Sequence, residues 1–318
     1  MSSGKTVAHS VVDPTPAGRR FAALLVVLYA LIAMVPLVWI LLTGFKSPPD
    51  SISYPPKVVF QPTLEGYVNL FTTRSRQTDE YIESLGPPTT WYDDLVRSRN
   101  MVITGPSRFA DRYMNSIIIG FGSTFLAVLL GTLAAYGFSR FKVPLKDDLL
   151  FFILSTRMMP PIAVAIPIYL MYRTLGLSDT ALGMILLYTA VNVSLAVWLL
   201  KGFIDEIPME YEEAAVVDGY SRLQAFWKVV LPQARAGIAA TAIFCLIFAW
   251  NEYAFALLLT SGEAQTAPPF IPIIIGEGGL DWPAVAAGTT LFLLPIVVFT
   301  VLLRRQLLRG ITFGAVRK

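Results

Sequence analysis

The sequence predicts an all-α integral membrane protein with six transmembrane helices. The chain has 318 residues, of which 55% are hydrophobic, and its mean hydropathy is +0.60. Only 15% of the residues are charged, whereas about a quarter is usual for a soluble protein. A helix that spans a bilayer needs about 20 consecutive apolar residues. Six runs meet this need, at Phe21–Leu42, Ser116–Phe138, Leu149–Tyr172, Ala181–Leu200, Ala234–Thr260 and Ala284–Leu303.

Composition also limits the function classes that the chain can serve. The formal net charge is +3 and no basic, aromatic-rich patch occurs, so we expect no nucleic-acid partner. One cysteine and one histidine exclude a disulfide within the chain and a His/Cys metal cluster built from it alone. No catalytic constellation and no complete phosphate-binding loop occur. We therefore expect no enzymatic activity and no bound cofactor on this chain.

The chain begins with a polar stretch, residues 1–20, which we expect to be a mobile tail. The first apolar run, Phe21–Leu42, is too long for the apolar part of a secretory signal and lacks a clear cleavage site. We therefore interpret this run as a retained transmembrane helix.

Lysine and arginine in the short loops set the orientation, because cytoplasmic loops carry an excess of both. Several such residues precede the first run, follow the second, follow the fourth and follow the sixth. The short third loop has only Arg173, and the fifth loop has none. Both termini, including the tail 310–318, and the loop 203–233 are therefore predicted to be cytoplasmic.

The first outer segment, residues 43–115, divides into two parts. Its first part, Ser47–Phe71, is rich in proline, and residues 74–108 are polar with several aromatic side chains. The second part is either a docking element for an external partner or a tolerated insertion. We favour the insertion, because long surface loops add little to the entropy of folding.

The third apolar run contains a charge and a proline pair. Arg157 lies about nine residues into the run, or roughly 14 Å deep, near mid-bilayer. Charged groups at this depth are candidates for a functional role. Met158 and Met159 then precede Pro160-Pro161, which should bend the helix, and such a bend could line a translocation path. Alternatively, Arg157 binds carbonyls that the prolines leave free.

Polar and aromatic side chains in the other runs are further candidates for a solute path. Glu252 lies roughly 27 Å from the cytoplasmic face, about 13 Å from the depth of Arg157, which argues against a direct ion pair. A position at the outer headgroups is the alternative for Glu252. Five more side chains could bind a sugar, or could instead join helices or anchor at the interface. They are Tyr169, Asn192, Trp250, Asn251 and Tyr253.

The cytoplasmic loop 203–233 has the capping signals of two short helices. Pro208 is favoured at a helix start, and the carboxylates Glu210, Glu212 and Glu213 suit the positive end of the helix dipole. Gly219 can adopt the left-handed conformation that closes a helix. The sequence therefore predicts a first helix that ends in a glycine turn.

Ser221 with Gln224 three residues later has the form of a capping box that opens the second helix. We expect this helix to stop before Pro232. A simple linker would have no need of two capped helices.

This helix pair resembles the EAA loop of ABC importer permeases. The family pattern is Glu-Ala-Ala, three residues, Gly, nine residues, Ile, one residue and Leu-Pro. The chain has Glu213-Ala214-Ala215, Gly219, Val229 and Leu231-Pro232, with valine in place of isoleucine.

From Asn115 to Lys318 the chain resembles the six-helix, MalG-like permease subunits of carbohydrate ABC importers. Besides the EAA loop, six stretches carry this resemblance. They are Ala134–Phe141, Met158–Pro161, Ile166–Tyr169, Leu175–Thr180, Trp250–Tyr253 and Gly310–Val316.

The resemblance implies a role for the chain and a set of partners. Residues 116–309 would form a five-helix permease core in the cytoplasmic (inner) membrane of a prokaryote. A second, usually different, permease subunit would complete the pathway, two ATPase subunits would carry ATP and Mg²⁺, and an extracytoplasmic binding protein would deliver the solute.

The loop 203–233 would dock on an ATPase subunit and couple ATP hydrolysis to transport. The implied coupling residues are Glu210, Glu213, Ala214, Ala215, Asp218, Gly219, Leu231 and Pro232.

The solute would be a sugar or sugar-like molecule: an oligosaccharide, a monosaccharide, a polyol or a glycerol phosphate. One alternative is an ABC permease for another solute class, and a second is an ATP-independent secondary transporter. The second alternative leaves the capped helix pair unexplained.

Overall fold

The computed structural model describes residues 16–276 and 279–303. The described part of the chain is mainly helical, with two small antiparallel strand pairs, β1–β2 and β3–β4. In chain order the elements are α1 (Pro16–Thr43), α2 (Pro48–Ser51), α3 (Glu65–Phe71), β1 (Thr72–Arg76), α4 (Asp79–Ser84), α5 (Trp91–Arg97), β2 (Met101–Pro106), α6 (Phe109–Arg140), α7 (Lys146–Ser155), η1 (Thr156–Met158), α8 (Pro161–Leu175), α9 (Ala181–Asp205), α10 (Glu210–Val217), α11 (Arg222–Ala225), η2 (Phe226–Val230), α12 (Leu231–Trp250), α13 (Ala254–Leu259), α14 (Ala267–Phe270), η3 (Ile271–Ile273), β3 (Ile275–Gly276), β4 (Gly279–Leu280) and α15 (Trp282–Leu302).

Within the described residues, five helices are long and apolar enough to cross a membrane, or six if the bent pair α7–α8 is one span. The six predicted runs therefore correspond to α1, α6, the pair α7–α8, α9, α12 and α15. Helix α6 begins seven residues before the predicted Ser116, and α1 begins at Pro16. Residues 16–20, predicted to belong to a mobile tail, are thus helical, and residues 1–15 and 304–318 lie outside the described residues.

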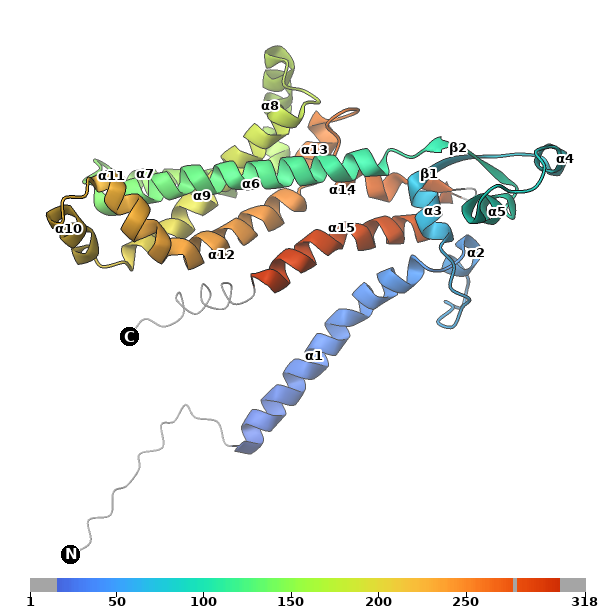
Figure 1. Cartoon of the computed structure of the whole chain (residues 1–318), viewed down its shortest axis with the longest axis horizontal. Helices are drawn as coiled ribbons and strands as arrows, with labels where there is room; N and C mark the ends of the chain where they lie inside the picture. The colour runs from blue at the N-terminus through green and yellow to red at the C-terminus, as the bar shows by residue number, and fades with distance from the viewer. Residues whose placement is uncertain (1–15, 277–278, 304–318) are drawn as a thin grey trace, which may run out of the picture.

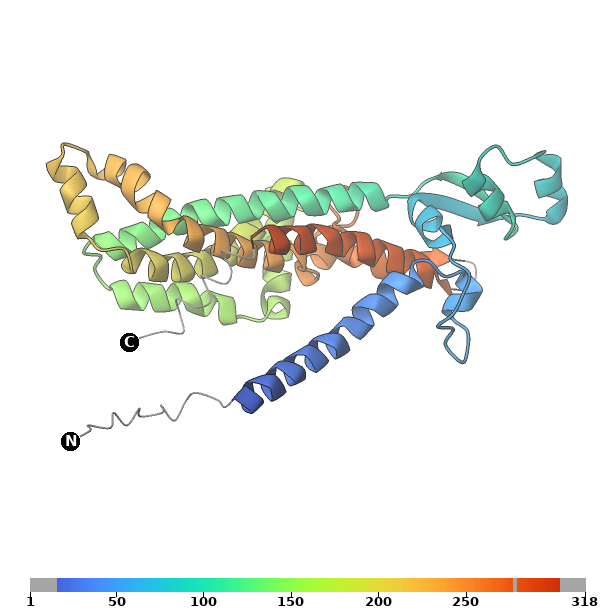
Figure 2. The ribbon, with the colours of Figure 1, turned by 60° about the horizontal axis from the view of Figure 1, so that its bottom comes forward.

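Helices α6, α9 and α12 lie side by side and form the centre of the protein (Figures 1 and 2). Small residues bring α6 and α9 together: Ala127, Ala135 and Ala196 are completely buried. At Gly131 an added Cβ atom would lie only 2.5 Å from the Cβ atom of Ala196. A backbone approach this close through small residues is a typical way to pack helices in a membrane.

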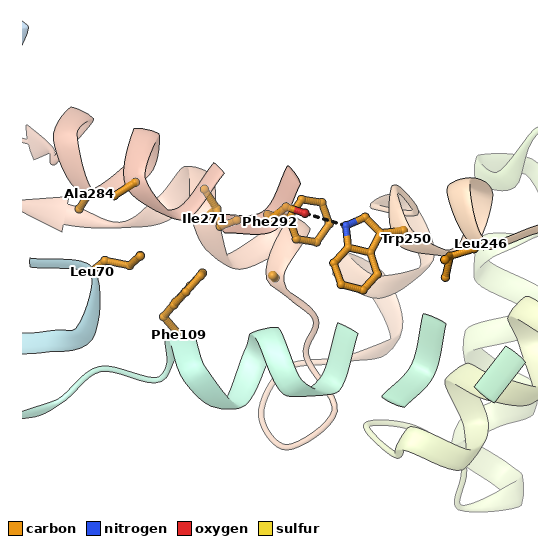
Figure 3. Packing of buried hydrophobic residues seen from close by; sticks show 9 residues of the cluster. Leu70, Phe109, Leu246, Trp250, Ile271, Ala284 and Phe292 are labelled. Carbon is orange, nitrogen blue, oxygen red and sulfur yellow. Dashed lines mark hydrogen bonds between the residues drawn. The ribbon is translucent and has the colours of Figure 1, made fainter. Parts of the chain in front are cut away.

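A second packing centre lies at the outer end, where α15 and α12 meet the start of α6 (Figure 3). The rings of Trp250 and Phe292 stack with their centroids 4.9 Å apart. The indole Nε1 of Trp250 also donates a hydrogen bond of 3.0 Å to the carbonyl oxygen of Phe292. Leu70 and Phe109 pack in the same cluster. The outer segment is thereby joined to the membrane helices.

Helix α1 stands apart from this body along most of its length (Figures 1 and 2). None of its residues is buried. The chain touches α15 just beyond its outer end, where a Cβ atom added at Gly44 would lie 3.3 Å from the backbone nitrogen of Ala287. The apolar surface of α1 is therefore available to lipid or to another membrane protein.

The third predicted run, Leu149–Tyr172, is not one continuous helix. The chain bends by 93° between α7–η1 and α8. Met159 and Pro160 are extended, with ψ angles of 125° and 132°. A proline disfavours the helical conformation of the residue before it, so the pair Pro160-Pro161 forces the break. Pro167, by contrast, lies within α8.

The fifth predicted run, Ala234–Thr260, begins and ends at later residues than the corresponding helix in the structure. The chain stays helical from Arg222 to Trp250, so the prediction that the second loop helix stops before Pro232 is wrong. The π-helical turn η2, in which the N–H of Leu231 donates to the oxygen of Phe226, widens the helix just before the proline ring. The side-chain amide of Gln233 donates a hydrogen bond of 3.1 Å to the carbonyl oxygen of Val229.

Two polar side chains end this span at Trp250 and start α13. The side-chain amide of Asn251 donates to the carbonyl of Ile247 at 2.8 Å. The carboxylate of Glu252 accepts the backbone N–H groups of Phe255 and Ala256 at 2.9 and 3.1 Å. Side-chain hydrogen bonds of this kind compete with a continuous helix. The predicted continuation to Thr260 is therefore interrupted.

The loop that follows α13 is held by a carboxylate from the α8–α9 connection. Asp179 accepts hydrogen bonds from the N–H groups of Ser261, Glu263 and Ala264 at 3.0–3.2 Å. Burial raises the pKa of Asp179, but these hydrogen bonds outweigh it, and the pKa lies below its ordinary value. This links the stretch Leu175–Thr180 to the outer end of α13.

The contact of α6 with α9 makes a testable prediction about two glycines of one helix. Gly131→Ala should lower the free energy of unfolding by about 1–3 kcal/mol, because the new methyl group overlaps Ala196. Gly137→Ala, in the same helix with no atom within 4 Å of the new Cβ atom, should raise stability by about 0.5–1 kcal/mol. Thermal unfolding of the purified protein in detergent measures both. Equal shifts for the two variants would contradict the close approach.

Candidate functional site

The candidate functional site is the helix pair α10–α11 at one end of the molecule (Figure 1). Helix α10 closes with the predicted glycine turn. Gly219 has a φ angle of +92°. Its N–H donates to the carbonyl oxygen of Val216 at 3.0 Å, and the N–H of Tyr220 donates to the carbonyl oxygen of Ala215 at 3.0 Å. These two bonds form a Schellman motif. The helix itself begins at Glu210, two residues after Pro208.

The predicted capping box at the start of α11 is confirmed. The N–H of Gln224 donates to the hydroxyl of Ser221 at 3.2 Å, and the N–H of Ser221 donates to the Gln224 side chain at 2.8 Å. The C-terminal end of α10 and the N-terminal end of α11 are thus both capped by hydrogen bonds. The pair is a fixed helix–turn–helix rather than a loose linker.

The outward face of the pair combines carboxylates with apolar side chains. The exposed polar and small residues of this face are Glu210, Glu213, Ala214 and Asp218. Val217 is also on the surface, with 86% of it exposed. Other large apolar side chains of this face are exposed as well: Met209, Tyr211, Val216 and Leu223. An exposed apolar patch of this kind marks a contact surface for another protein.

The inward face ties the pair to the membrane helices through Glu212. Its carboxylate forms an ion pair with Arg140 at 2.5 Å and accepts a hydrogen bond of 2.9 Å from the hydroxyl of Tyr136. Arg140 also donates to the carbonyl of Ile207 at 2.8 Å. The side chains of Arg140 and Glu212 are only 8% and 10% exposed. Helix α10 is therefore bound to the C-terminal end of α6.

Apolar packing completes this attachment. Of the predicted coupling residues, Ala215 is buried, and Leu231 packs against the cluster that contains Ile207, Phe226 and Val230. The rings of Tyr136 and Phe226 are 4.5 Å apart. Pro232 is exposed in the first turn of α12. Together with Glu212, these contacts fix α10 and α11 to α6, α9 and α12 as one body.

Sequence reasoning did not identify the anchoring role of Glu212, Arg140 and Tyr136. Glu212 was interpreted only as a first-turn carboxylate. One signal was available: Tyr136 and Arg140 are four residues apart and so lie on one face of α6. Two polar side chains on one face of a helix end are expected to contact a polar partner, but the sequence does not identify that partner.

Of the third-span candidates, Arg157, Met158 and Pro160 lie at the break between α7 and α8, and Tyr169 lies within α8. The guanidinium of Arg157 lies over the ring of Phe248, 4.0 Å from its centroid. Its Nη1 atom is buried and has no hydrogen-bond partner, so it does not bind carbonyls freed by the prolines through this atom. Met158, Pro160 and Tyr169 are exposed.

Two of the four candidates of the fourth and fifth spans, Asn192 and Trp250, are buried, and Glu252 is half-buried. Asn192 donates to the carbonyl of Cys245 at 3.3 Å, and Trp250 lies in the outer packing cluster. Glu252 accepts a hydrogen bond of 2.6 Å from the hydroxyl of Tyr188 in addition to the N–H groups of α13. Asn251 is exposed. Among the described residues, Arg157 and Glu252 form no ion pair, in agreement with their predicted separation in depth.

The Arg140–Glu212 pair can be tested by a double-mutant cycle. Glu212→Gln should lower the free energy of unfolding by about 3 kcal/mol, because it leaves Arg140 buried without its countercharge. Arg140→Gln should do the same, and the double variant should lose less than the sum. Thermal unfolding measures the coupling, with Glu210→Gln on the exposed face of the same helix as the control. Strict additivity would show that the pair does not hold α10.

Comparisons with known proteins identify the family. The model for the binding-protein-dependent transport system inner membrane component matches residues 127–312. The probable ABC transporter permease protein y4oR of Sinorhizobium fredii is 32% identical over 288 residues, covering 91% of this chain and 92% of the relative. The trehalose transport system permease protein SugB of Mycobacterium tuberculosis is 39% identical over 212 residues, covering 66% and 77%.

A solved structure supports the fold. A crystal structure of a bacterial ABC transporter involved in the import of the acidic polysaccharide alginate contains a chain with a TM-score of 0.66 and 20% sequence identity. The similarity covers 92% of this chain and 98% of that chain. The predicted fold class and the family resemblance are confirmed. This chain is a multi-pass inner-membrane protein that belongs to the binding-protein-dependent transport system inner membrane component family, the permeases of ABC transporters.

Proposed function

We propose that the chain forms half of the translocation pathway of an ATP-driven importer of a sugar or sugar-like solute. Family membership supports a permease that depends on a binding protein. The trehalose permease, at 39% identity, supports a saccharide as the solute. The solute class includes oligosaccharides, monosaccharides, polyols and glycerol phosphates.

The observation that carries the proposed mechanism is the outward face of α10–α11 on a rigid attachment. Glu210, Glu213 and Asp218 surround apolar side chains on a surface that is open in the chain alone. The small side chain of Ala214 lets a partner approach closely. The partner is an ATPase subunit, on which ATP and Mg²⁺ bind and hydrolysis occurs. The permease chain itself is not an enzyme.

The attachment explains how movement of the ATPase reaches the membrane. When the ATPase subunits close on ATP, the bound α10 moves with them. The Arg140–Glu212 ion pair and the packing around Phe226 carry this movement into α6, α9 and α12. ATP shifts the pathway between orientations only if the ATPase binds one orientation more tightly than the other.

The complete transporter contains a second permease subunit, two ATPase subunits and an extracytoplasmic solute-binding protein. The exposed apolar surfaces of α1 and α8 support a second membrane subunit, since lipid or protein must cover them. The positive-inside rule supports cytoplasmic termini. It also supports a cytoplasmic α10–α11 pair, because Arg222 and Lys228 belong to the same loop.

The proposed solute contacts are Arg157, which is half-buried, and four exposed candidates: Met158, Pro160, Tyr169 and Asn251. The candidates Asn192, Trp250 and Glu252 are buried or half-buried and form hydrogen bonds within the protein.

The coupling proposal predicts the effect of two substitutions. Glu213→Ala and Gly219→Pro should each reduce the ATP turnover that the loaded binding protein stimulates by at least about tenfold, within the usual range of coupling energies. Glu213 would lose its partner on the ATPase, and proline cannot adopt the φ of +92° at Gly219. ATP turnover and subunit co-purification of the reconstituted complex are the measurements.

Two matched variants serve as controls. Glu206→Ala removes an exposed carboxylate just beyond α9, and Gly219→Asn keeps a residue that tolerates a positive φ. Both should couple almost as wild type does. If Glu213→Ala and Gly219→Pro also assemble and couple normally, α10–α11 is a linker, and the secondary-transporter alternative must be reconsidered.

A separate prediction concerns the solute contacts. Tyr169→Ala and Asn251→Ala should each lower solute uptake about fivefold, the loss expected for one hydrogen bond. Maximal ATP turnover should remain. Phe125→Ala, which truncates another exposed aromatic side chain, on α6, is the control for uptake into proteoliposomes. Uptake unchanged in both variants would remove these two residues from the path.

A further inference from the structure

The outer segment between α3 and α6 folds into a small unit, residues 72–106, which we call the outer unit. Strands β1 and β2 pair antiparallel, with Arg74 opposite Ile103 and Arg76 opposite Met101. Helices α4 and α5 follow one another between the strands. Figure 1 shows the outer unit at the end of the molecule opposite to α10–α11. The segment predicted as an insertion is thus an ordered structure.

Local interactions stabilise the outer unit. Val96 and Met101 are buried against Val68 of α3. Asp93 forms an ion pair of 2.8 Å with Arg97 and also accepts the N–H of Thr89. A stretch that only filled space between two helices would need none of these contacts.

The outer unit is fixed to the membrane body through Asp281, which is buried. Its carboxylate accepts hydrogen bonds from Arg74 at 3.0 Å and from the amide of Asn69 at 2.9 Å. The same carboxylate caps the start of α15 by accepting the N–H of Ala284 at 3.1 Å. A second ion pair joins Arg99 to Glu65 of α3. A force on the outer unit therefore reaches α15 directly.

The arginines and the exposed carboxylates of the outer unit differ in whether they form ion pairs. The arginines Arg74, Arg97 and Arg99 each pair with a carboxylate, and Arg76 is engaged as well. Four carboxylates of α4 and α5 are instead exposed and form no ion pair with any described residue. They are Asp79, Glu80, Glu83 and Asp94. The exposed surface of α4 and α5 is therefore acidic, whereas Arg76 and Arg99 are exposed elsewhere in the outer unit.

Aromatic side chains lie among these carboxylates. Trp91 is 60% exposed and Tyr81 and Tyr92 are 47% and 40% exposed. The rings of Trp91 and Tyr92 meet edge to face at 5.7 Å, which limits their freedom before any partner binds. Tryptophan and tyrosine supply much of the binding energy at protein interfaces. Four unpaired carboxylates would be repelled by an anionic lipid surface. The combination fits a protein partner with a basic surface.

We propose that the outer unit is a docking surface for the extracytoplasmic solute-binding protein, and that the facing patch of that protein is basic. The inference rests on the proposed function, since it deepens the assignment of that partner. Carboxylates guide the encounter of the two proteins and the aromatic rings fill pockets on the partner. The Asp281 junction then links docking to the position of α15.

The first test measures ATP turnover of the complete reconstituted transporter against the concentration of its loaded solute-binding protein. The test variant combines Asp79→Asn, Glu80→Gln, Glu83→Gln and Asp94→Asn, which preserve shape. The concentration of binding protein that gives half-maximal turnover should rise at least about fivefold at low salt. This difference from the wild type should shrink near 0.5 M salt, because charges more than about 4 Å apart are then largely screened from one another. Maximal turnover should not change.

Matched variants separate charge, contact and general effects. Asp147→Asn with Asp148→Asn neutralises two exposed carboxylates in the first turn of α7, outside the outer unit, and should leave half-saturation as it is. Trp91→Ala with Tyr92→Ala should raise half-saturation at every salt concentration. If the fourfold variant and the aromatic variant both keep the wild-type value, the outer unit is a tolerated insertion and the proposal is overturned.

A cross-linking measurement tests the contact directly. The native Cys245 is completely buried, so a cysteine placed at Glu83 offers a single accessible thiol on the described surface. A photoreactive thiol reagent on Glu83→Cys should capture the purified binding protein, whereas the same reagent on Asp148→Cys should not. Capture of lipid or of a second copy of this chain instead of the binding protein would overturn the proposal.

These outcomes are distinct from a failure of the proposed function. A wild-type complex that no loaded binding protein stimulates would refute the importer itself. Glu213→Ala lowers the maximal turnover, whereas the outer-unit variants change only the concentration of binding protein that is needed.

Discussion

The close approach of α6 and α9 is the contact on which the other arrangements depend. At Gly131 the two backbones are separated by little more than the methyl group of Ala196. This approach brings the last turns of α6 beside the end of α9, where Arg140 reaches the carbonyl of Ile207 and the carboxylate of Glu212. A larger residue at the crossing would separate the helices and remove the attachment of α10. Packing between membrane helices thus decides the position of α10.

The two helix breaks solve the same problem in different ways. Non-helical backbone is tolerated at membrane depth only against protein or a water-filled cavity. At the end of α12 the side chains of Asn251 and Glu252 satisfy the freed backbone groups within the chain. At Met159-Pro160 the surface is open in the isolated chain. Another subunit or water must therefore cover the α7–α8 break in the assembled transporter, which agrees with its proposed place beside the solute path.

Both ends of the molecule use a buried ion pair to attach an exposed unit to long helices. Arg140–Glu212 holds α10 to α6, and Arg74–Asp281 holds the outer unit to α15. A buried pair contributes little net stability, since desolvation of the charges offsets their attraction. Its geometry is directional, however, and we infer that the pairs serve to orient the two units. A unit that must transmit movement or receive a partner needs a fixed orientation more than additional stability.

The sequence by itself determined the membrane class, six spans if the bent pair α7–α8 is one of them, the family and the caps of α10 and α11. These features depend on local composition and spacing: runs of apolar residues, Gly219 at a left-handed position and Ser221 three residues before Gln224. The proline pair Pro160-Pro161 likewise predicted the bend of the third span. Tertiary structure alone decided the continuity of the helix through Pro232 and the partners of Glu212, Arg74 and Asp281. Sequence spacing could not supply them, because each depends on groups far apart in the chain or on the space around a backbone. The contact between Asn69 and Asp281, for example, joins residues 212 positions apart.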